Sequence, residues 1–269
     1  MCKQQTKRNI LDEIADRTRQ RITEQKQVKA MQQMREEALA LAGGQAPEFP
    51  FLQALKKDGI SLICEAKKAS PSKGLIAEHF PYVEIARDYE AGGASAISVL
   101  TEPYYFLGSN EYLKEIRKAV SIPLLRKDFV VDPYMIYEAK MLGADACLLI
   151  CSILKEETLK EYLDLAHSLG LSALVETHDD EEIAMALRIG ARIIGVNNRN
   201  LKDFTVDVTH SSALLKNVPD DVVFVAESGI TTKEQVASLY AEGVDAVLIG
   251  ETFMREEDRR AIVAEFANV

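Results

Sequence analysis

Six polar side chains stand where short apolar runs of the sequence end, and together they could carry acid–base chemistry. They are Glu65, Lys67, Lys127, Glu176, Asn197 and Glu227. Carboxylate and ammonium groups that share one pocket pair with each other, because an isolated buried charge is costly. Pairing also shifts the pKa of each group, which prepares it to donate or accept a proton. An ordinary transition from strand to loop explains any one of these residues, but it explains the whole set poorly.

Two glycine-containing segments near the end of the chain point to an anion site. They read Glu227-Ser228-Gly229-Ile230 and Leu248-Ile249-Gly250-Glu251. Glycine lets backbone N–H groups approach an anion closely. Barrels built of alternating strands and helices often bind phosphate at the loops after their last two strands. Glycine is common in loops, so each segment alone is weak evidence, but together they predict a small phosphorylated substrate.

Eight short apolar and β-branched runs could position these groups. They span residues 61–67, 96–101, 123–128, 146–150, 172–176, 192–197, 222–227 and 246–250. Most of the runs are apolar on both faces, as buried parallel strands are. Helical patterns lie between them, and several of these lead into a glycine that can end a helix. The spacing leaves room for a strand, a loop and a helix in each repeat.

Eight such repeats favour an α/β fold in which the sheet closes on itself, a (β/α)8 TIM barrel. A doubly wound sheet would need a glycine-rich first turn, but the turn after the first run reads Ala69-Ser70-Pro71-Ser72-Lys73-Gly74. Active sites of barrels lie at the carboxyl ends of the strands. Since side chains of a strand alternate between faces, Glu65 and Lys67 point the same way.

The first fifty residues differ from the rest of the chain. Residues 9–41 hold no glycine or proline, and Ile10, Leu11, Ile14 and Ala15 form a helical stripe. We therefore expect residues 1–269 to form one barrel domain, with a helical extension over about residues 1–50 packed on it. That extension could cover the mouth of the barrel. Composition alone favours a solvated amphipathic addition.

Charge and composition narrow the function classes. The formal net charge is −10, which disfavours broad binding to nucleic acid. The sequence has no apolar run long enough to cross a bilayer. Its four cysteines form no disulfide framework or metal-ligand spacing, and we expect neither a metal site nor membrane contact. The default location is the cytoplasm. His178 is expected to be an exposed loop histidine.

Several motifs together resemble indole-3-glycerol-phosphate synthases over essentially the whole chain. The most specific are the decapeptide from Glu65 to Gly74 and the segment Asn197-Asn198-Arg199-Asn200-Leu201. Others are Leu125-Arg126-Lys127-Asp128-Phe129, Leu174-Val175-Glu176 and the two glycine-containing segments described above.

The resemblance implies a cofactor-independent carbon–carbon lyase of tryptophan biosynthesis. Such an enzyme closes the indole ring of 1-(2-carboxyphenylamino)-1-deoxyribulose 5-phosphate and releases carbon dioxide and water. It requires no metal and no organic cofactor. The sequence does not determine the oligomeric state, and a monomer is the working expectation.

The resemblance also implies roles for individual residues. The catalytic set is Lys127 as general acid, Glu176 as base, Glu65 as neighbour of the acid, and Lys67, which holds the substrate carboxylate or assists dehydration. Substrate-binding residues are Asn197, Arg199 and Glu227, with Phe129, Leu148 and Leu201 around the aryl ring. Phosphate-binding residues are Ser70, Ser228, Gly229, Gly250 and Glu251.

Two other functions fit the sequence less well. A phosphoribosylanthranilate isomerase would use a cysteine at the end of the first strand and an aspartate near the sixth. Cys64 has the opposite parity to Glu65, and the sixth run offers Asn197. A non-catalytic barrel that binds phosphorylated metabolites would keep the glycine loops but lose the lysine–glutamate set, which is complete here.

Overall fold

Eight parallel strands close into a barrel in this computed structural model, which describes residues 9–43, 48–200 and 204–269. The strands are β1 (Ser61–Ala66), β4 (Ala96–Leu100), β5 (Leu124–Lys127), β6 (Ala146–Ile150), β7 (Ser172–Thr177), β8 (Ile193–Asn197), β9 (Val223–Glu227) and β10 (Ala246–Ile249). Neighbours in sequence are neighbours in the barrel, and β1 pairs with both β4 and β10. The TIM-barrel prediction is confirmed, and each strand end lies within one residue of its expected position.

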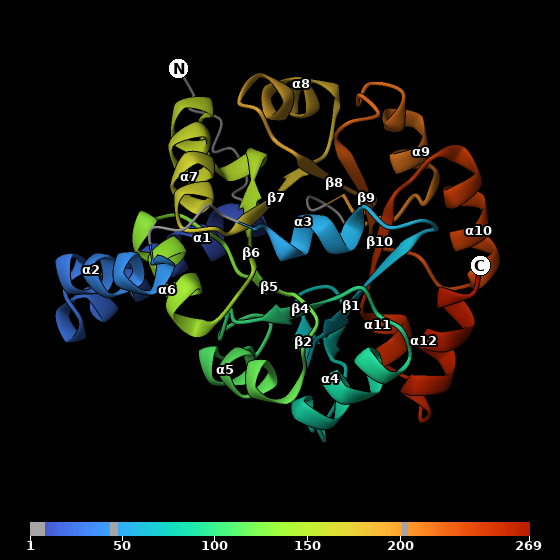
Figure 1. The fold of residues 1–269 in the computed structure, drawn as a ribbon, viewed down its shortest axis with the longest axis horizontal. Coiled ribbons are helices and arrows are strands. Elements are labelled where there is room, and N and C mark those ends of the chain that lie inside the picture. The colour runs from blue at the N-terminus through green and yellow to red at the C-terminus, as the bar shows by residue number, and fades with distance from the viewer. Residues whose placement is uncertain (1–8, 44–47, 201–203) are drawn as a thin grey trace, which may run out of the picture.

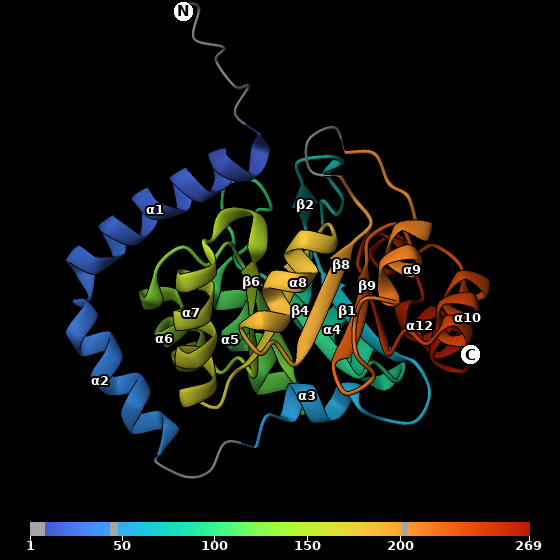
Figure 2. The same ribbon diagram turned by 90° about the horizontal axis from the view of Figure 1, so that it is seen from above.

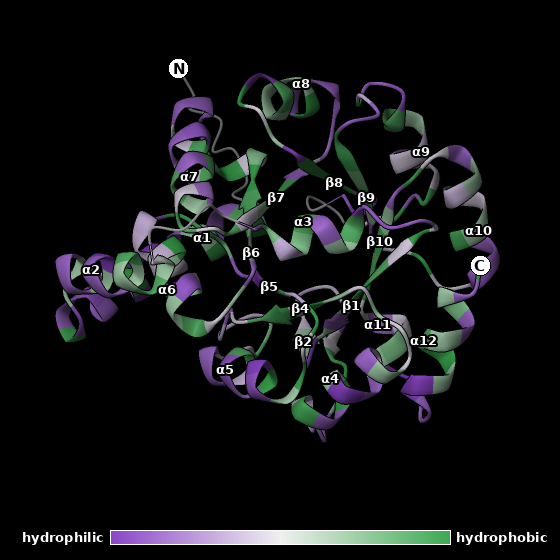
Figure 3. Ribbon diagram, viewed as in Figure 1, coloured by the Kyte–Doolittle hydropathy of each residue, from purple (hydrophilic) through white to green (hydrophobic). Residues whose placement is uncertain are grey.

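Helices surround the strands on the outside of the barrel (Figure 1). They are α4 (Tyr82–Ala91), α5 (Asn110–Ala119), α6 (Pro133–Leu142), α7 (Glu156–Ser168), α8 (Asp180–Arg188), α9 (Thr209–Leu215), α10 (Lys233–Glu242), α11 (Glu251–Met254) and α12 (Arg259–Ala267). A short 3₁₀ helix, η1 (Cys151–Ile153), follows β6, and a small hairpin of β2 (Ala69–Ser70) and β3 (Gly74–Leu75) follows β1. The outward helix surfaces are mostly hydrophilic, whereas the strands are hydrophobic (Figure 3).

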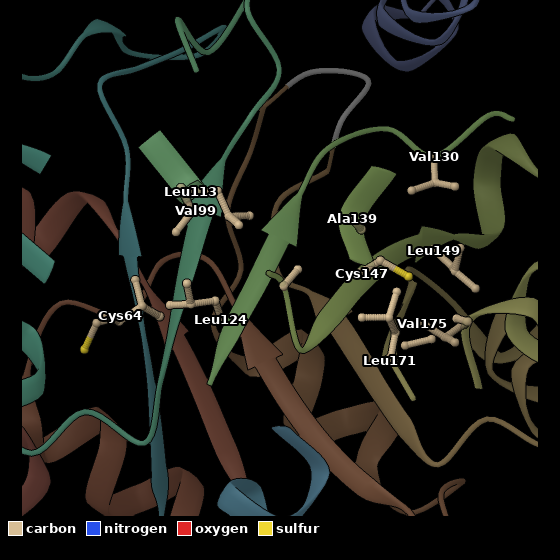
Figure 4. Packing of buried hydrophobic residues seen from close by; sticks show 14 of the residues in the cluster. Cys64, Val99, Leu113, Leu124, Val130, Ala139, Cys147, Leu149, Leu171 and Val175 are labelled. Atoms are coloured by element: carbon tan, nitrogen blue, oxygen red, sulfur yellow. The ribbon is translucent and has the colours of Figure 1, made fainter. Parts of the chain in front are cut away.

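The alternation of side chains along each strand builds two separate cores. One set, which includes Cys64, Leu124 and Val175, points outward and packs under the helices (Figure 4). The other set, which includes Ile63 and Leu174, fills the barrel interior. Glu65 has the parity of Ile63, so its side chain continues the interior column towards the carboxyl end of the barrel.

The N-terminal segment forms three helices that reach opposite ends of the barrel (Figure 2). These are α1 (Ile10–Val28), α2 (Met31–Ala42) and α3 (Pro50–Leu55). Phe51 and Leu55 of α3 join the interior core and close the amino end of the barrel. Helix α2 packs against α6. None of the helices in the described ranges is long and apolar enough to span a membrane.

Helix α1 is not the solvated addition that composition favoured. It buries Leu11, Ile14, Ala15, Thr18, Arg21 and Ile22. Leu11 and Ile14 belong to the interior core cluster, at the carboxyl end of the barrel. The expectation was wrong because composition records the polar outer face of the helix. It does not record the open barrel mouth, whose apolar side chains favour a cover that removes them from water.

Candidate active site

A cavity of about 690 Å³ opens at the carboxyl ends of the strands. Every predicted site residue that the structure describes lines it: Glu65, Lys67, Ser70, Lys127, Phe129, Leu148, Glu176, Asn197, Arg199, Glu227, Ser228, Gly229, Gly250 and Glu251. Leu201, predicted to lie near the aryl ring, falls outside the described residues. These residues lie on seven of the barrel strands or on the loops that follow them, so barrel closure is what brings them together.

Lys127 lies at the centre of the charged residues in the cavity. Its Nζ donates to Glu227 Oε2 at 2.5 Å and to Glu176 Oε2 at 3.4 Å. The side chain is 14% exposed. Burial alone would lower the pKa of Lys127, but the charges of Glu227, Glu176 and Glu65 raise it above its ordinary value. Lys127 is therefore charged, and carboxylates from two other strands hold its side chain in one orientation.

Glu65 and Lys67 form a second ion pair on one face of β1. Lys67 Nζ donates to Glu65 Oε1 at 2.6 Å, and Ser98 Oγ donates to Glu65 Oε2 at 3.3 Å. Burial alone would raise the pKa of Glu65, but the charges of Lys67 and Lys127 hold it below its ordinary value. The period of two along the strand predicted this shared face, and the structure confirms it.

The cluster holds one carboxylate more than it holds ammonium groups. Glu65 pairs with Lys67, and both Glu176 and Glu227 pair with Lys127. Glu227 Oε1 is buried and has no hydrogen-bond partner among the residues that the structure describes. Burial raises the pKa of Glu227 to about 7, and the charge of Glu176 acts in the same direction. The cluster can therefore hold an extra proton near neutral pH, as acid–base chemistry requires.

Two glycines, one in β8 and one just after β10, create the space for Glu227 and Glu65. A Cβ added at Gly195 of β8 would overlap with Glu227 Oε1. A Cβ added at Gly250, just after β10, would lie 2.7 Å from Glu65 Oε1 and 3.0 Å from Lys67 Nζ. Gly250 was predicted for the phosphate site, but the structure adds this steric reason. Gly195 was not predicted, and its only sequence signal is a glycine inside a strand.

Glu176 has two further neighbours beside Lys127. Asn197 Nδ2 donates to Glu176 Oε1 at 3.3 Å, and His178 Nε2 lies 3.7 Å from the same oxygen. The expectation of an exposed loop histidine was wrong. The His178 side chain is only 19% exposed and also contacts Glu182, which begins α8 with other acidic residues. Burial alone would lower the pKa of His178, but its hydrogen bond to Glu182 and the charge of Glu176 raise it.

The predicted phosphate-binding residues lie together at one side of the cavity. Ser228 and Gly229 both have positive φ values, 70° and 79°, which turn the chain sharply after β9. Two cations that the sequence reading missed line the same region, Lys73 and Arg255, and both pair with Glu251. Lys73 lies inside the first-strand motif, so its position there was an available signal.

The other side of the cavity is apolar. Phe129 and Leu148 were predicted here, and the ring centroid of Phe106 lies 6.0 Å from that of Phe129. The sequence reading missed further lining residues, which are Ile10, Leu11, Ile14, Leu100, Phe106, Ile150 and Leu248. Ile150 could have been found because it shares the face of Leu148 on β6. The helical stripe of α1 was recognised, and a cover over the barrel mouth was considered as the alternative that composition did not favour.

The arrangement does not match the isomerase alternative. Cys64 is fully buried in the outer core under the helices, away from the cavity. β8 supplies Asn197 to the cavity rather than an aspartate. In the described ranges, no three histidine, cysteine, aspartate or glutamate side chains are grouped as metal ligands. The geometry thus combines a protonated lysine, several carboxylates, an apolar wall and glycine-rich turns.

Comparisons with known proteins point to one family. A family model described as indole-3-glycerol phosphate synthase matches residues 11–266. The indole-3-glycerol phosphate synthase of Ruminiclostridium cellulolyticum is 54% identical over 256 residues, covering 95% of this chain and 98% of that protein. The one of Endomicrobium trichonymphae is 53% identical over 247 residues, covering 91% and 95%.

Solved structures share the fold at lower sequence identity. Thiamine phosphate pyrophosphorylase from Pyrococcus furiosus superposes with a TM-score of 0.60 at 21% identity, covering 78% of this chain and 94% of that chain. A structure titled "Native KDPGal structure" gives a TM-score of 0.56 at 16% identity, covering 79% and 95%. At these identities the likeness concerns the barrel alone.

Proposed function

Since the chain belongs to the indole-3-glycerol-phosphate synthase family, we propose that Lys127, Glu176, Glu65 and Lys67 carry out its ring closure. The enzyme is a carboxy-lyase of tryptophan biosynthesis. It converts 1-(2-carboxyphenylamino)-1-deoxyribulose 5-phosphate to indole-3-glycerol phosphate, carbon dioxide and water. The observation that carries the proposal is the contact of Lys127 Nζ with Glu227 and Glu176 inside the cavity.

In the first step, the ring carbon that bears the carboxylate attacks the ketone carbon of the sugar chain. A carbon–carbon bond forms, and the electrons of the C=O bond move to oxygen. Lys127 donates its proton to that oxygen, because it is charged and held by carboxylates. Glu227, 2.5 Å from Nζ and with a pKa near neutrality, can return a proton to Lys127 afterwards.

In the second step, the bond to the carboxylate breaks and its electron pair returns to the ring as carbon dioxide leaves. In the third step, the hydroxyl leaves as water and a proton leaves the new ring, whose electrons form the pyrrole double bond. Glu176 takes that proton. Asn197 orients the Glu176 carboxylate, because its Nδ2 donates to Glu176 Oε1 at 3.3 Å. Lys67, beside Glu65, can hold the substrate carboxylate or protonate the leaving hydroxyl.

Substrate orientation follows from the two sides of the cavity. The phosphate lies at Ser70, Ser228, Gly229, Gly250 and Glu251, with charge from Lys73 and Arg255. The aryl ring lies against Phe129 and Leu148 under α1. Arg199 lines the cavity and donates its backbone N–H to Asn197 Oδ1, so it supports the substrate-binding amide. The apolar side also keeps water from the charged groups.

The direct test is indole fluorescence formed from the anilino-ribulose phosphate by the purified enzyme. We expect turnover that persists after treatment with a chelator, and a much higher KM for the same compound without its phosphate. Lack of indole formation would contradict the activity. Activity that vanishes with chelator and returns with added metal would contradict the cofactor-free mechanism.

Gly195→Ala should lower kcat about tenfold, because its methyl group would displace the Glu227 carboxylate from Lys127. The matched control is Val196→Ala, in which a neighbouring side chain of the outer core is shortened. That control should lower the melting temperature but not kcat. Equal kcat values for Gly195→Ala and the unchanged enzyme would show that the Glu227 position does not matter.

We also propose a domain organisation, an oligomeric state and a cellular location for the enzyme. Residues 1–269 act as one barrel unit that includes the helical extension, because α1 and α3 both contribute to the interior core. The enzyme works as a monomer, since all proposed site residues come from one chain. It acts in the cytoplasm, in keeping with its composition and its cysteines.

A further inference from the structure

Asp128 is a buried carboxylate that stands between two residues of the active site. Lys127 precedes it and Phe129 follows it, and all three residues line the cavity. The side chain of Asp128 is fully buried. Asp128 Oδ1 accepts the backbone N–H of Phe129 at 2.8 Å. The position of this carboxylate therefore fixes the backbone on which both residues stand.

Arg21 of helix α1 is the nearest cation to Asp128. Its Nη2 donates to Asp128 Oδ1 at 2.8 Å and to Oδ2 at 2.9 Å. The Arg21 side chain is 9% exposed. The two residues are 107 positions apart, and Arg21 belongs to the N-terminal extension. A buried bond between two charged groups holds its partners firmly, because water does not screen it.

The remaining contacts of Asp128 come from the barrel itself. Thr101 Oγ1 donates to Asp128 Oδ2 at 2.8 Å, and Arg126 Nη2 lies 3.6 Å from the same oxygen. Arg126 is held in turn by Glu138, at 2.5 Å. Glu102 and Glu138 are the other charges that act on Arg21. Because Thr101 and Arg126 also contact Asp128, loss of Arg21 should loosen Asp128 without leaving it unpaired.

We propose that Arg21 is a positioning residue for catalysis: it ties helix α1 through Asp128 to the strand end that carries Lys127 and Phe129. The same helix lines the aryl side of the cavity with Leu11 and Ile14. Docking of α1 and orientation of the general acid are thus one event. The inference rests on the proposed role of Lys127 and goes beyond it by assigning a function to a residue outside the cavity.

The test compares two charged residues of the same helix. Arg21→Met removes the bond to Asp128. The matched control is Lys26→Met, which removes the bond of Lys26 Nζ to Asp132 Oδ2 at 2.7 Å, so it weakens the docking of α1 at α6 without affecting β5. We expect Arg21→Met to lower kcat about tenfold with KM changed less than about threefold. Lys26→Met should leave kcat unchanged, and Arg21→Lys should recover part of the loss.

Equal kcat values for Arg21→Met and Lys26→Met would overturn the proposal, as would Arg21→Lys no faster than Arg21→Met. If Arg21→Met does not fold, Arg21→Lys is compared with Lys26→Met, and equal kcat values again overturn it. The activity of the unchanged enzyme distinguishes failure of this inference from failure of the proposed function. Failure of the unchanged enzyme to form indole refutes the proposed function. If the unchanged enzyme is active and the Arg21 variants have the same kcat as it, only the role of Arg21 is refuted.

Discussion

Lys127→Ala is expected to lower kcat by at least about a hundredfold, because the ketone oxygen then receives no proton during ring closure. Steady-state indole fluorescence measures the effect, and circular dichroism checks that the barrel is intact. Lys127→Arg is the matched variant. A guanidinium keeps the charge beside Glu227 and Glu176 but is a far weaker acid. Near-normal turnover of Lys127→Ala would refute the role of Lys127. Near-normal turnover of Lys127→Arg would show that Lys127 contributes its positive charge and not its proton.

The Lys127→Ala variant should also respond differently to pH. Burial already raises the pKa of Glu227 to about 7, and the loss of Lys127 raises it further. A carboxyl group with a raised pKa in the folded state holds its proton longer than in the unfolded state, so stability falls as pH rises above about 4.5. The melting temperature of Lys127→Ala should therefore fall further below that of the unchanged enzyme at pH 8 than at pH 5. An equal difference at both pH values would contradict the charge cluster.

Glu176→Gln is expected to lower kcat by about two to four orders of magnitude while KM changes little. The amide keeps the shape of the side chain, but it cannot accept the proton that must leave during dehydration. Because Glu176 acts after decarboxylation, the first turnover of the variant should release carbon dioxide before indole forms. Rapid-quench measurement of both products tests this order.

A surface carboxylate provides the control for Glu176→Gln. Glu156 pairs with Arg188 on exposed positions outside the cavity, and Glu156→Gln should leave kcat unchanged. A raised KM with unchanged kcat in Glu176→Gln would place this residue in binding rather than chemistry. If this variant releases carbon dioxide and indole at the same rate, Glu176 acts already at ring closure.

The strand pattern was readable from the sequence because it is a local property. Parallel strands of a barrel are buried on both faces, so each appears as a short apolar run bounded by polar residues. The same rule placed the site, since polar residues that end such runs must lie at the carboxyl end of the barrel. The shared face of Glu65 and Lys67 followed from the period of two along a strand.

Contacts between distant segments could not be read in the same way. Lys127 and Glu227 are 100 positions apart and meet only because the barrel closes. Composition could not place α1 over the mouth, and it suggested an exposed His178 where the fold buries the ring beside Glu176 and Glu182. Nor did it show that Gly195 leaves room for Glu227.

The sequence by itself therefore determined the fold, the identities of the reactive groups and the end of the barrel at which they stand. Tertiary structure alone decided which ammonium faces which carboxylate, and that the N-terminal helix bonds through Arg21 to the strand of the general acid. The reason is physical. Apolar periodicity is imposed on each segment by its own burial, whereas an ion pair depends on the relative positions of two segments, which are fixed only when the whole barrel has formed.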